Sequence, residues 1–398
     1  MRIAAGGGWL ACTLAGAVAG CRSGGGSTST TPSALASATA AQPTASAPSA
    51  IASDAPRELP VAPLSFHVVA KSSSQLSLDV LDDAALVYVD PARDALLLSQ
   101  HRIQLLPGLF SGVTVPDGWS FGPVDGRWPD LALLTVAKRG YLGAATGTTL
   151  LRKSGARWLP MPGELAHGEL VDVAGSNLLV RTAEGARFFD PAGHAQKLAV
   201  QSSVDGEPFH VTGASKDAKG RIFVSGFIHA PSKETGLRLS AGGSVDGGVA
   251  IVQRWEPGAT APIVDRMPDP NAARVDVLDG AGVYSSGDVT FALFGKSHAL
   301  GKFQGGSWSI EKLPIDARCS GVRDFSLAKD GVVFFGTTGG LSQPSVFLRR
   351  SVDGRYERLT LPPGLDVSGL YAEGAAALWV ASEGALYFTE PLGVVTFP

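Results

Sequence analysis

Residues 328–335, AKDGVVFF, carry the pattern that decides the fold: a small residue, a polar turn, a glycine and an apolar strand. The same order recurs in residues 214–224, ASKDAKGRIFV, and in residues 372–380, AEGAAALWV. Short β-branched and aromatic runs bounded by Asp and Gly are typical of strands joined by tight turns. The three copies indicate a repeated β-hairpin, and helical periodicity is nearly absent from the chain after about residue 61.

A second pattern alternates with the first. It consists of an apolar strand, a polar turn, an aromatic residue and then Leu-Pro, and it occurs in residues 150–160 (LLRKSGARWLP), 302–314 (KFQGGSWSIEKLP) and 347–362 (FLRRSVDGRYERLTLP). The first pattern predicts the inner hairpin of a four-stranded sheet, and the second predicts its outer hairpin with the crossover to the next sheet. Small sheets bury both faces by stacking around an axis, so the alternation predicts an all-β fold, a β-propeller.

The positions of the inner strands predict the number of blades. Their expected starts are Leu78, Asp130, Leu170, His210, Val275, Val322 and Ser368, at an average spacing of roughly 48 residues. We therefore expect seven four-stranded blades, closed either by a strand near residues 64–70 or by the last strand, residues 393–398. Six or eight blades are alternatives, and so is a two-sheet sandwich followed by a second β domain.

Residues 351–356, SVDGRY, add a turn motif. They are similar to a degenerate Asp-box, the Ser-x-Asp-x-Gly-x-Thr-Trp turn of sialidase-type blades, with one glycine displaced and Tyr356 outside the usual aromatic position. The repeats of residues 322–389 resemble those of bacterial propellers of the two-component-regulator, sialidase-repeat and photosystem-assembly-factor kinds. The resemblance implies the fold of two or three blades and no catalytic residue, because Asp-boxes are structural turns remote from such active sites.

The N-terminus fits a bacterial lipoprotein signal. Met1-Arg2 precedes a weakly apolar segment, residues 3–17, and the sequence Val18-Ala19-Gly20-Cys21 fits the lipobox. The small residues let the extended chain enter the peptidase, and the cysteine thiol becomes the thioether to diacylglycerol. Two or three acyl chains hold a protein on a membrane, because each buried CH₂ contributes about 0.8 kcal/mol. An ordinary secretory cleavage after Ala19 is the alternative.

We therefore expect three parts: a signal peptide over residues 1–20, a lipidated Cys21 with a disordered Ser/Thr/Ala/Pro-rich linker over residues 21–60, and the propeller over residues 61–398. The expected location is the bacterial cell envelope, with Arg22 favouring the outer membrane. The expected partners are the membrane, through the lipid, and an envelope protein or glycan. The propeller itself is expected to be monomeric.

Composition excludes several classes of function. The formal net charge of −3 gives no basic footprint for nucleic acid. The sequence has no phosphate-binding loop, His-Glu-x-x-His or Cys-x-x-Cys, and its seven histidines lack metal-ligand spacing, so neither a metal nor a cofactor is expected. Cys319 is expected to be the lone thiol of the mature chain.

Two segments are candidates for binding because loops on a rigid scaffold carry function. Residues 115–129, VPDGWSFGPVDGRWP, are predicted to link the first two units, and residues 228–248 are predicted to be an insertion between two strands of the fourth. Both would emerge on one face of the propeller. Exposed Trp and Arg often anchor interfaces, whereas packing between blades is the alternative for both tryptophans. The candidate binding residues are Trp119, Arg127, Trp128, His229 and Arg238.

The sequence contains no catalytic constellation, which together with lipid anchoring predicts a non-catalytic binding or assembly module acting through this loop-rich face. An envelope glycan hydrolase or lyase with acidic residues in the propeller funnel is the alternative. Two carboxylates about 5–10 Å apart on the axis would favour the enzyme. A sensor or secretion-linked accessory is the third hypothesis.

Overall fold

The computed structural model describes residues 59–89, 94–139, 145–229, 248–268, 274–275, 281–294, 299–315, 321–338, 346–363, 365 and 367–396. All of them belong to one compact unit, Leu59–Pro398. The expected signal peptide, Cys21 and nearly all of the linker lie outside the described residues, so these expectations stay predictions. No helix in the described part of the chain is long and apolar enough to cross a membrane.

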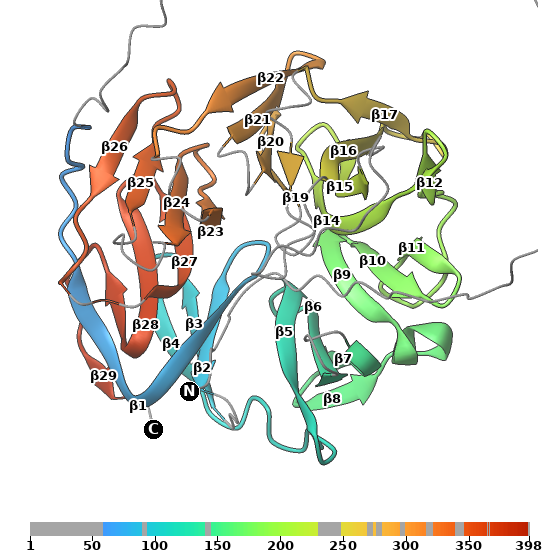
Figure 1. Ribbon diagram of the computed structural model, residues 1–398. Helices are drawn as coiled ribbons and strands as arrows, with labels where there is room; N and C mark the ends of the chain where they lie inside the picture. The colour runs from blue at the N-terminus through green and yellow to red at the C-terminus, as the bar shows by residue number, and fades with distance from the viewer. Residues whose placement is uncertain are drawn as a thin grey trace, which may run out of the picture. The chain divides into compact units, whose positions relative to one another are not determined.

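The described chain is an all-β propeller, as expected (Figure 1). One sheet contains both ends of the described chain, in the order β27 (Val367–Gly374), β28 (Ala377–Phe388), β1 (His67–Val80), β2 (Ala85–Val89), β3 (Ala95–Ser99) and β4 (Arg102–Leu106), with β29 (Val395–Thr396) beside β1. The next two sheets are β5 (Trp119–Arg127), β6 (Leu131–Arg139), β7 (Ala145–Ser154) and β8 (Arg157–Pro160), and then β9 (Glu169–Ala174), β10 (Asn177–Thr182) and β11 (Gly185–Phe189).

Three further sheets complete the ring. They are β14 (His210–Lys216), β15 (Ile222–His229), β16 (Gly248–Trp255), β17 (Ile263–Arg266) and β18 (Arg274–Val275); β19 (Ala281–Ser286), β20 (Val289–Phe294), β21 (Ala299–Gln304) and β22 (Ser307–Lys312); and β23 (Gly321–Leu327), β24 (Val333–Thr338), β25 (Phe347–Arg350) and β26 (Tyr356–Leu359). A small hairpin, β12 (Ser203–Val204) with β13 (Glu207–Pro208), and a 3-10 helix, Gly163–His167, lie outside these sheets.

The ring has six blades, so the expected count of seven is wrong. The difference lies in β1, which pairs with β28 from His67 to Gln75 and with β2 from Leu76 to Val80. One long strand thereby joins the units expected to be first and last into a single seven-stranded sheet. Both segments expected to close the ring take part, because β29 pairs in parallel with Ala70 and Lys71 of β1.

The expected start of the second inner strand at Asp130 is also wrong. Residues 119–127 form β5, and Asp130 lies in the turn that follows it. The sequence Gly122-Pro123 resembles a loop because proline cannot donate a ladder hydrogen bond. In the structure, the pairing of β5 with β6 shifts register between Phe121 and Val124, and this irregularity accommodates the proline.

The merged sheet contributes two innermost strands, β27 and β1, and each of the other five sheets contributes one. These strands contact one another in the ring order β1, β5, β9, β14, β19, β23, β27 and back to β1. Apolar side chains from neighbouring sheets fill the space between the sheets. Phe223 of β15 and Phe303 of β21, both fully buried, meet edge to face with 5.3 Å between ring centroids. Burial of such side chains stabilises the fold by about 1.5–3 kcal/mol each.

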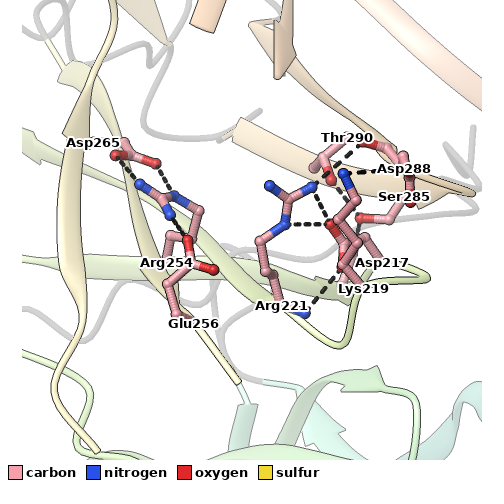
Figure 2. Close-up of polar contacts among 10 residues, drawn as sticks. Asp217, Lys219, Arg221, Arg254, Glu256, Asp265, Ser285, Asp288 and Thr290 are labelled. Atoms are coloured by element: carbon pink, nitrogen blue, oxygen red, sulfur yellow. Dashed lines mark hydrogen bonds and ion pairs between the residues drawn. The ribbon is translucent and has the colours of Figure 1, made fainter. Parts of the chain in front are cut away.

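Two buried ion pairs lie close to this contact between the β14–β18 sheet and the β19–β22 sheet (Figure 2). Asp217 and Arg221 pair at 2.6 Å with side-chain exposures of 0% and 8%. Arg254 pairs with Asp265 at 2.8 Å. The guanidinium carbons of both arginines lie 4.9 Å from the centroid of the Phe303 ring. Each ion pair lies within the β14–β18 sheet and its turns, and it is the contact of both guanidiniums with Phe303 that connects this sheet to β21 of the next one, so these charges have a structural role.

The Asp-box-like segment forms the exposed turn between β25 and β26. The Arg355 backbone N–H donates to Ser351 Oγ at 3.1 Å, and the Arg355 guanidinium donates to Asp353 at 2.6 Å. Gly354, with φ of 87°, supplies the left-handed residue of the turn. All these contacts are local, which gives the segment a structural role.

Candidate functional site

The propeller has two different faces. Since the strands of each sheet are antiparallel, the turns after its first and third strands emerge at one end of the axis, here called the turn face. The loops after second strands and the links between sheets emerge at the opposite end, here called the loop face. Five turns or strand ends meet on the turn face and enclose a cavity of about 310 Å³. The residues of this turn-face pocket include Asp83, His101, Trp128, Lys329, Tyr371 and Glu373.

Glu373, at the end of β27, is the most enclosed acid of the pocket, with only 8% of its side chain exposed. Its Oε2 accepts the backbone N–H of His101 at 2.6 Å. Its Oε1 is buried and has no hydrogen-bond partner among the described residues. Leaving a buried acceptor unpaired costs on the order of 1–3 kcal/mol, so Glu373 carries an unsatisfied carboxylate oxygen beside the pocket.

The turn that contacts Glu373 has a strained backbone. Gln100 and His101 join β3 to β4 with φ of 50° and 57°. Two successive left-handed residues favour Asn-Gly, and other residues cost on the order of 1–2 kcal/mol each. The His101 ring also contacts Glu390, with 3.0 Å between Nδ1 and Oε2. A strained turn held by two carboxylates in a pocket wall is typical of a functional constraint.

The remaining walls are aromatic and acidic. Burial raises the pKa of the Tyr371 hydroxyl, and the carboxylates of Glu373 and Asp83 raise it further. Trp128 is half-buried, and Lys153 Nζ lies 5.0 Å from the centroid of its ring. The Trp128 ring therefore already receives one ammonium group on its face.

A second acidic cluster lies on the inner strands next to the pocket. Asp79 of β1 accepts hydrogen bonds from the Tyr88 hydroxyl at 2.6 Å and from the Val124 backbone N–H at 2.7 Å. Asp172 of β9 accepts the Ala214 backbone N–H at 2.7 Å. Each carboxylate thus bonds to the next inner strand of the ring, and both fasten neighbouring sheets near the axis.

Asp125 of β5 differs from these two aspartates. It accepts a hydrogen bond from the adjacent Gly126 N–H at 2.6 Å and makes no bond to a neighbouring sheet within the described residues. Burial raises the pKa of Asp125 well above its usual value, and the Asp172 carboxylate raises it further. Burial also raises the pKa of Asp172 to about 7 and that of Asp79 to about 6. Near neutral pH, Asp79 and Asp172 are able to hold and release protons.

Asp82 links the acidic cluster to the pocket. Burial raises its pKa and the carboxylate of Asp83 raises it further, whereas Arg127 and Lys329 lower it. Arg127 therefore lies beside the acidic residues of the turn face. No group of three or more His, Cys, Asp or Glu among the described residues is placed to hold a metal ion.

The structure separates the residues predicted to act together in residues 115–129. Trp119 begins β5 and Arg127 ends it. A nine-residue strand spans about 26 Å, so Trp119 lies at the loop face, whereas Arg127 and Trp128 lie at the turn face. The expected linking loop is therefore a strand with its ends on two faces. Neither placement tests whether the three residues bind a partner.

Trp119 lines a shallower groove of about 320 Å³ on the loop face, here called the loop-face groove. Its charged residues already have partners: Arg181 pairs with Glu169 at 2.5 Å and donates to the Val211 carbonyl at 3.0 Å. The groove therefore offers fewer open hydrogen-bonding groups than the turn-face pocket.

Other predicted residues lie partly or wholly beyond what the structure describes. Arg238, Cys21 and Cys319 lie outside the described residues, and His229 is described only as the last residue of β15. His210 begins β14, and its ring stacks on Phe227 with centroids 4.9 Å apart.

Sequence reasoning did not single out His101, Lys329 or Glu373. Lys329 and Glu373 stand in the repeated turns used to recognise the fold, where a polar residue is explained by the turn itself. The one local signal is Gln100-His101, two non-glycine residues directly after the apolar strand β3.

No family model matches the sequence, and no curated protein matches it. Among solved structures, the chain is similar to a streptogramin B lyase, with 13% identity, a TM-score of 0.44, and coverage of 82% of this chain and 97% of the other. It is also similar to YCF48 bound to a D1 peptide, with 12% identity, a TM-score of 0.45, and coverage of 85% and 100%. A third similar structure is the extracellular domain assigned to a hybrid two component system of B. thetaiotaomicron, with 9% identity and a TM-score of 0.44; it covers 83% of this chain and 40% of the other. The site described above rests on this chain's own residues.

Proposed function

We propose that this chain is a non-catalytic binding module that takes its ligand in the turn-face pocket. The observation that carries the proposal is the largely buried Glu373 side chain, which forms part of the wall of a cavity of about 310 Å³ and whose Oε1 has no hydrogen-bond partner among the described residues. The volume of this cavity lies at the lower end of the range of small-ligand sites, about 300–1,000 Å³, and most of its wall is polar or charged, which favours a polar ligand. The strained Gln100–His101 turn supports the same reading, because it maintains a contact to Glu373.

The second element of the proposal is attachment to the cell envelope through Cys21. It rests on the lipobox at residues 18–21 and on the polar, Pro-rich residues that follow it. Labelling of the full chain in cells with a palmitate analogue tests it. We expect label on the wild type and none on Cys21→Ser, and a labelled Cys21→Ser would contradict the anchor.

A thermal-shift screen of the purified chain tests the binding function. The panel contains neutral sugars, amines, amino acids and small anions. We expect at least one class to raise the melting temperature of the wild type and of Trp119→Ala, but not of Trp128→Ala. The two variants are matched, since each removes one tryptophan, from the loop-face groove and from the turn-face pocket respectively. Loss of the effect only in Trp119→Ala would move the site to the loop face.

A second candidate function is an acid–base enzyme, and the inner-strand aspartates favour it. Asp125 and Asp172 are buried, electrostatically linked carboxyls with raised pKa values, as general acids require. Two observations favour a structural role instead: Asp172 and Asp79 already bond the backbone of the next strand. Hydrolysis of envelope glycans by the wild type, abolished in a folded Asp125→Asn variant, would establish the enzyme and displace the binding proposal.

A further inference from the structure

The charges of the turn-face pocket are unequal. Asp83 and Glu373 form part of its wall, and Glu390 stands behind His101. Lys329 is the permanent cation of the wall, and it is exposed at the rim. Negative charge therefore predominates at the enclosed end, where Glu373 lies, and positive charge at the solvent side.

Among the described residues, no positively charged side chain as buried as Glu373 pairs with its carboxylate. Its contact with the His101 ring is 3.6 Å from Oε2 to Nε2, and the ring is about half exposed, at 47%. The His101 backbone N–H satisfies Oε2 but brings no net charge. A buried carboxylate is stabilised by a cation or by several N–H donors, and Oε1 has neither among the described residues.

The aromatic walls are suited to the same kind of group. Ammonium groups bind over aromatic faces, best over Trp. Trp128 already holds Lys153 Nζ at 5.0 Å from its ring centroid, and Tyr371 provides a second, buried ring beside Glu373. A cation in the cavity would thus meet a carboxylate together with two aromatic rings.

We propose that the turn-face pocket recognises an organic cation, a ligand whose ammonium group pairs with Glu373 and packs against Trp128 and Tyr371. This inference rests on the proposed binding function and specifies the ligand class. A neutral sugar would leave Glu373 without a counter-charge, and an anion would face Asp83 and Glu373 together. Lys329 at the rim repels a bound cation and weakens its binding. Replacing Lys329 by a neutral residue should therefore strengthen cation binding.

The test is a titration of the purified full chain with benzylammonium, followed by the ligand's NMR signals at pH 7. Benzyl alcohol is the matched neutral probe, with the same ring and nearly the same size. We expect benzylammonium to bind about tenfold more tightly or better, and Glu373→Gln to remove most of that difference. Asp83→Asn, a second variant in case Glu373→Gln fails to fold, is expected to weaken binding about threefold.

Lys329→Met should change the affinity for benzylammonium in the opposite direction. Removing the like charge is expected to strengthen benzylammonium binding about threefold, while Lys312→Met, an exposed lysine at the end of β22, leaves it unchanged. Weaker binding in Lys329→Met would show that the Lys329 charge does not oppose the ligand's ammonium group and would overturn the inference. Equal binding of the two probes, unaffected by Glu373→Gln, would overturn the cation preference while leaving a pocket that binds ligands. Binding of neither probe at millimolar concentration would also overturn it, and the thermal-shift panel would then decide the binding function separately.

Discussion

Glu373 Oε2 accepts the backbone N–H of His101 at 2.6 Å across 272 residues of sequence. The two residues lie in the same seven-stranded sheet, His101 between β3 and β4 and Glu373 at the end of β27. The bond therefore connects the two regions of the chain that close the ring, at the wall of the proposed binding pocket.

The first prediction concerns the stability that this contact provides. Glu373→Ala removes the carboxylate that accepts the His101 N–H and should lower the free energy of unfolding by about 1 kcal/mol. Glu390→Ala removes the more exposed of the two carboxylates that contact His101 and should cost about 0.5 kcal/mol or less. Urea unfolding of the full chain measures both, and equal losses would contradict the assigned role of Glu373.

The second prediction concerns the strained turn. Gln100→Gly should raise the free energy of unfolding by about 0.5–1 kcal/mol, because glycine adopts a φ of 50° without steric cost. Gln104→Gly, an exposed position within β4, should lower it by a similar amount, since glycine weakens a strand. If both variants lose stability in the same denaturation experiment, the turn is not strained.

The third prediction concerns the buried Asp217–Arg221 ion pair shown in Figure 2. Asp217→Ala leaves the Arg221 guanidinium buried without its counter-charge and should cost about 3–5 kcal/mol. Arg266→Ala breaks a pair with Asp205 in which both side chains are 54% exposed, and should cost about 1 kcal/mol or less. Thermal unfolding of the two variants checks this order, and a reversal would refute the structural role of the buried pair.

The fourth prediction concerns pH. The folded state raises the pKa of Asp125 above 3.8, so between the unfolded and folded pKa values it holds a proton that the unfolded chain releases. Wild-type stability from this residue is therefore greatest below pH 3.8 and falls as pH rises. Asp125→Asn removes that loss and keeps an oxygen for the Gly126 N–H.

The Asp125→Asn variant should match the wild type near pH 4 and become more stable than the wild type as the pH rises toward 7. Urea titrations at several pH values measure the difference. Asp353 provides the contrast, because hydrogen bonds from Ser351 and Arg355 lower its pKa to about 2. Asp353→Asn should therefore be closest to the wild type at low pH and become less stable than the wild type as the pH rises. A constant gap between Asp125→Asn and wild type at all pH values would contradict the raised pKa of Asp125.

The repeated turn patterns were sufficient to predict the fold class and several inner strands. Leu170, His210, Val322 and Ser368 lie within one residue of the start of β9, β14, β23 and β27. These strands follow the simple alternation of turn and apolar run. The sequence did not predict β5, because Gly122 and Pro123 are typical of a loop. In the structure they lie inside the strand, at a shift in its register with β6.

Neither the number of blades nor the candidate site could be predicted from local sequence patterns. Whether β1 bends into two pairings depends on β28, more than 300 residues later in the chain, and no short motif encodes that register. The pocket likewise collects Asp83, His101, Trp128, Lys329 and Glu373 from turns that only the closed ring brings together. Trp119 and Trp128 were predicted as binding residues from their type and from their place in an expected linking loop on one face. Their expected common face is wrong, since Trp119 begins β5 and Trp128 follows its end, and their role in binding stays a prediction.

The most direct measurement of the central claim is the indole N–H spectrum of the full chain, labelled with ¹⁵N-tryptophan and titrated with benzylammonium. Trp128→Phe and Trp119→Phe assign the two relevant signals. Binding in the turn-face pocket predicts that the Trp128 signal shifts with a saturating dependence on ligand while the Trp119 signal stays in place. A shift of Trp119 alone would place binding at the loop-face groove, and no shift of either would contradict a ligand site in the turn-face pocket.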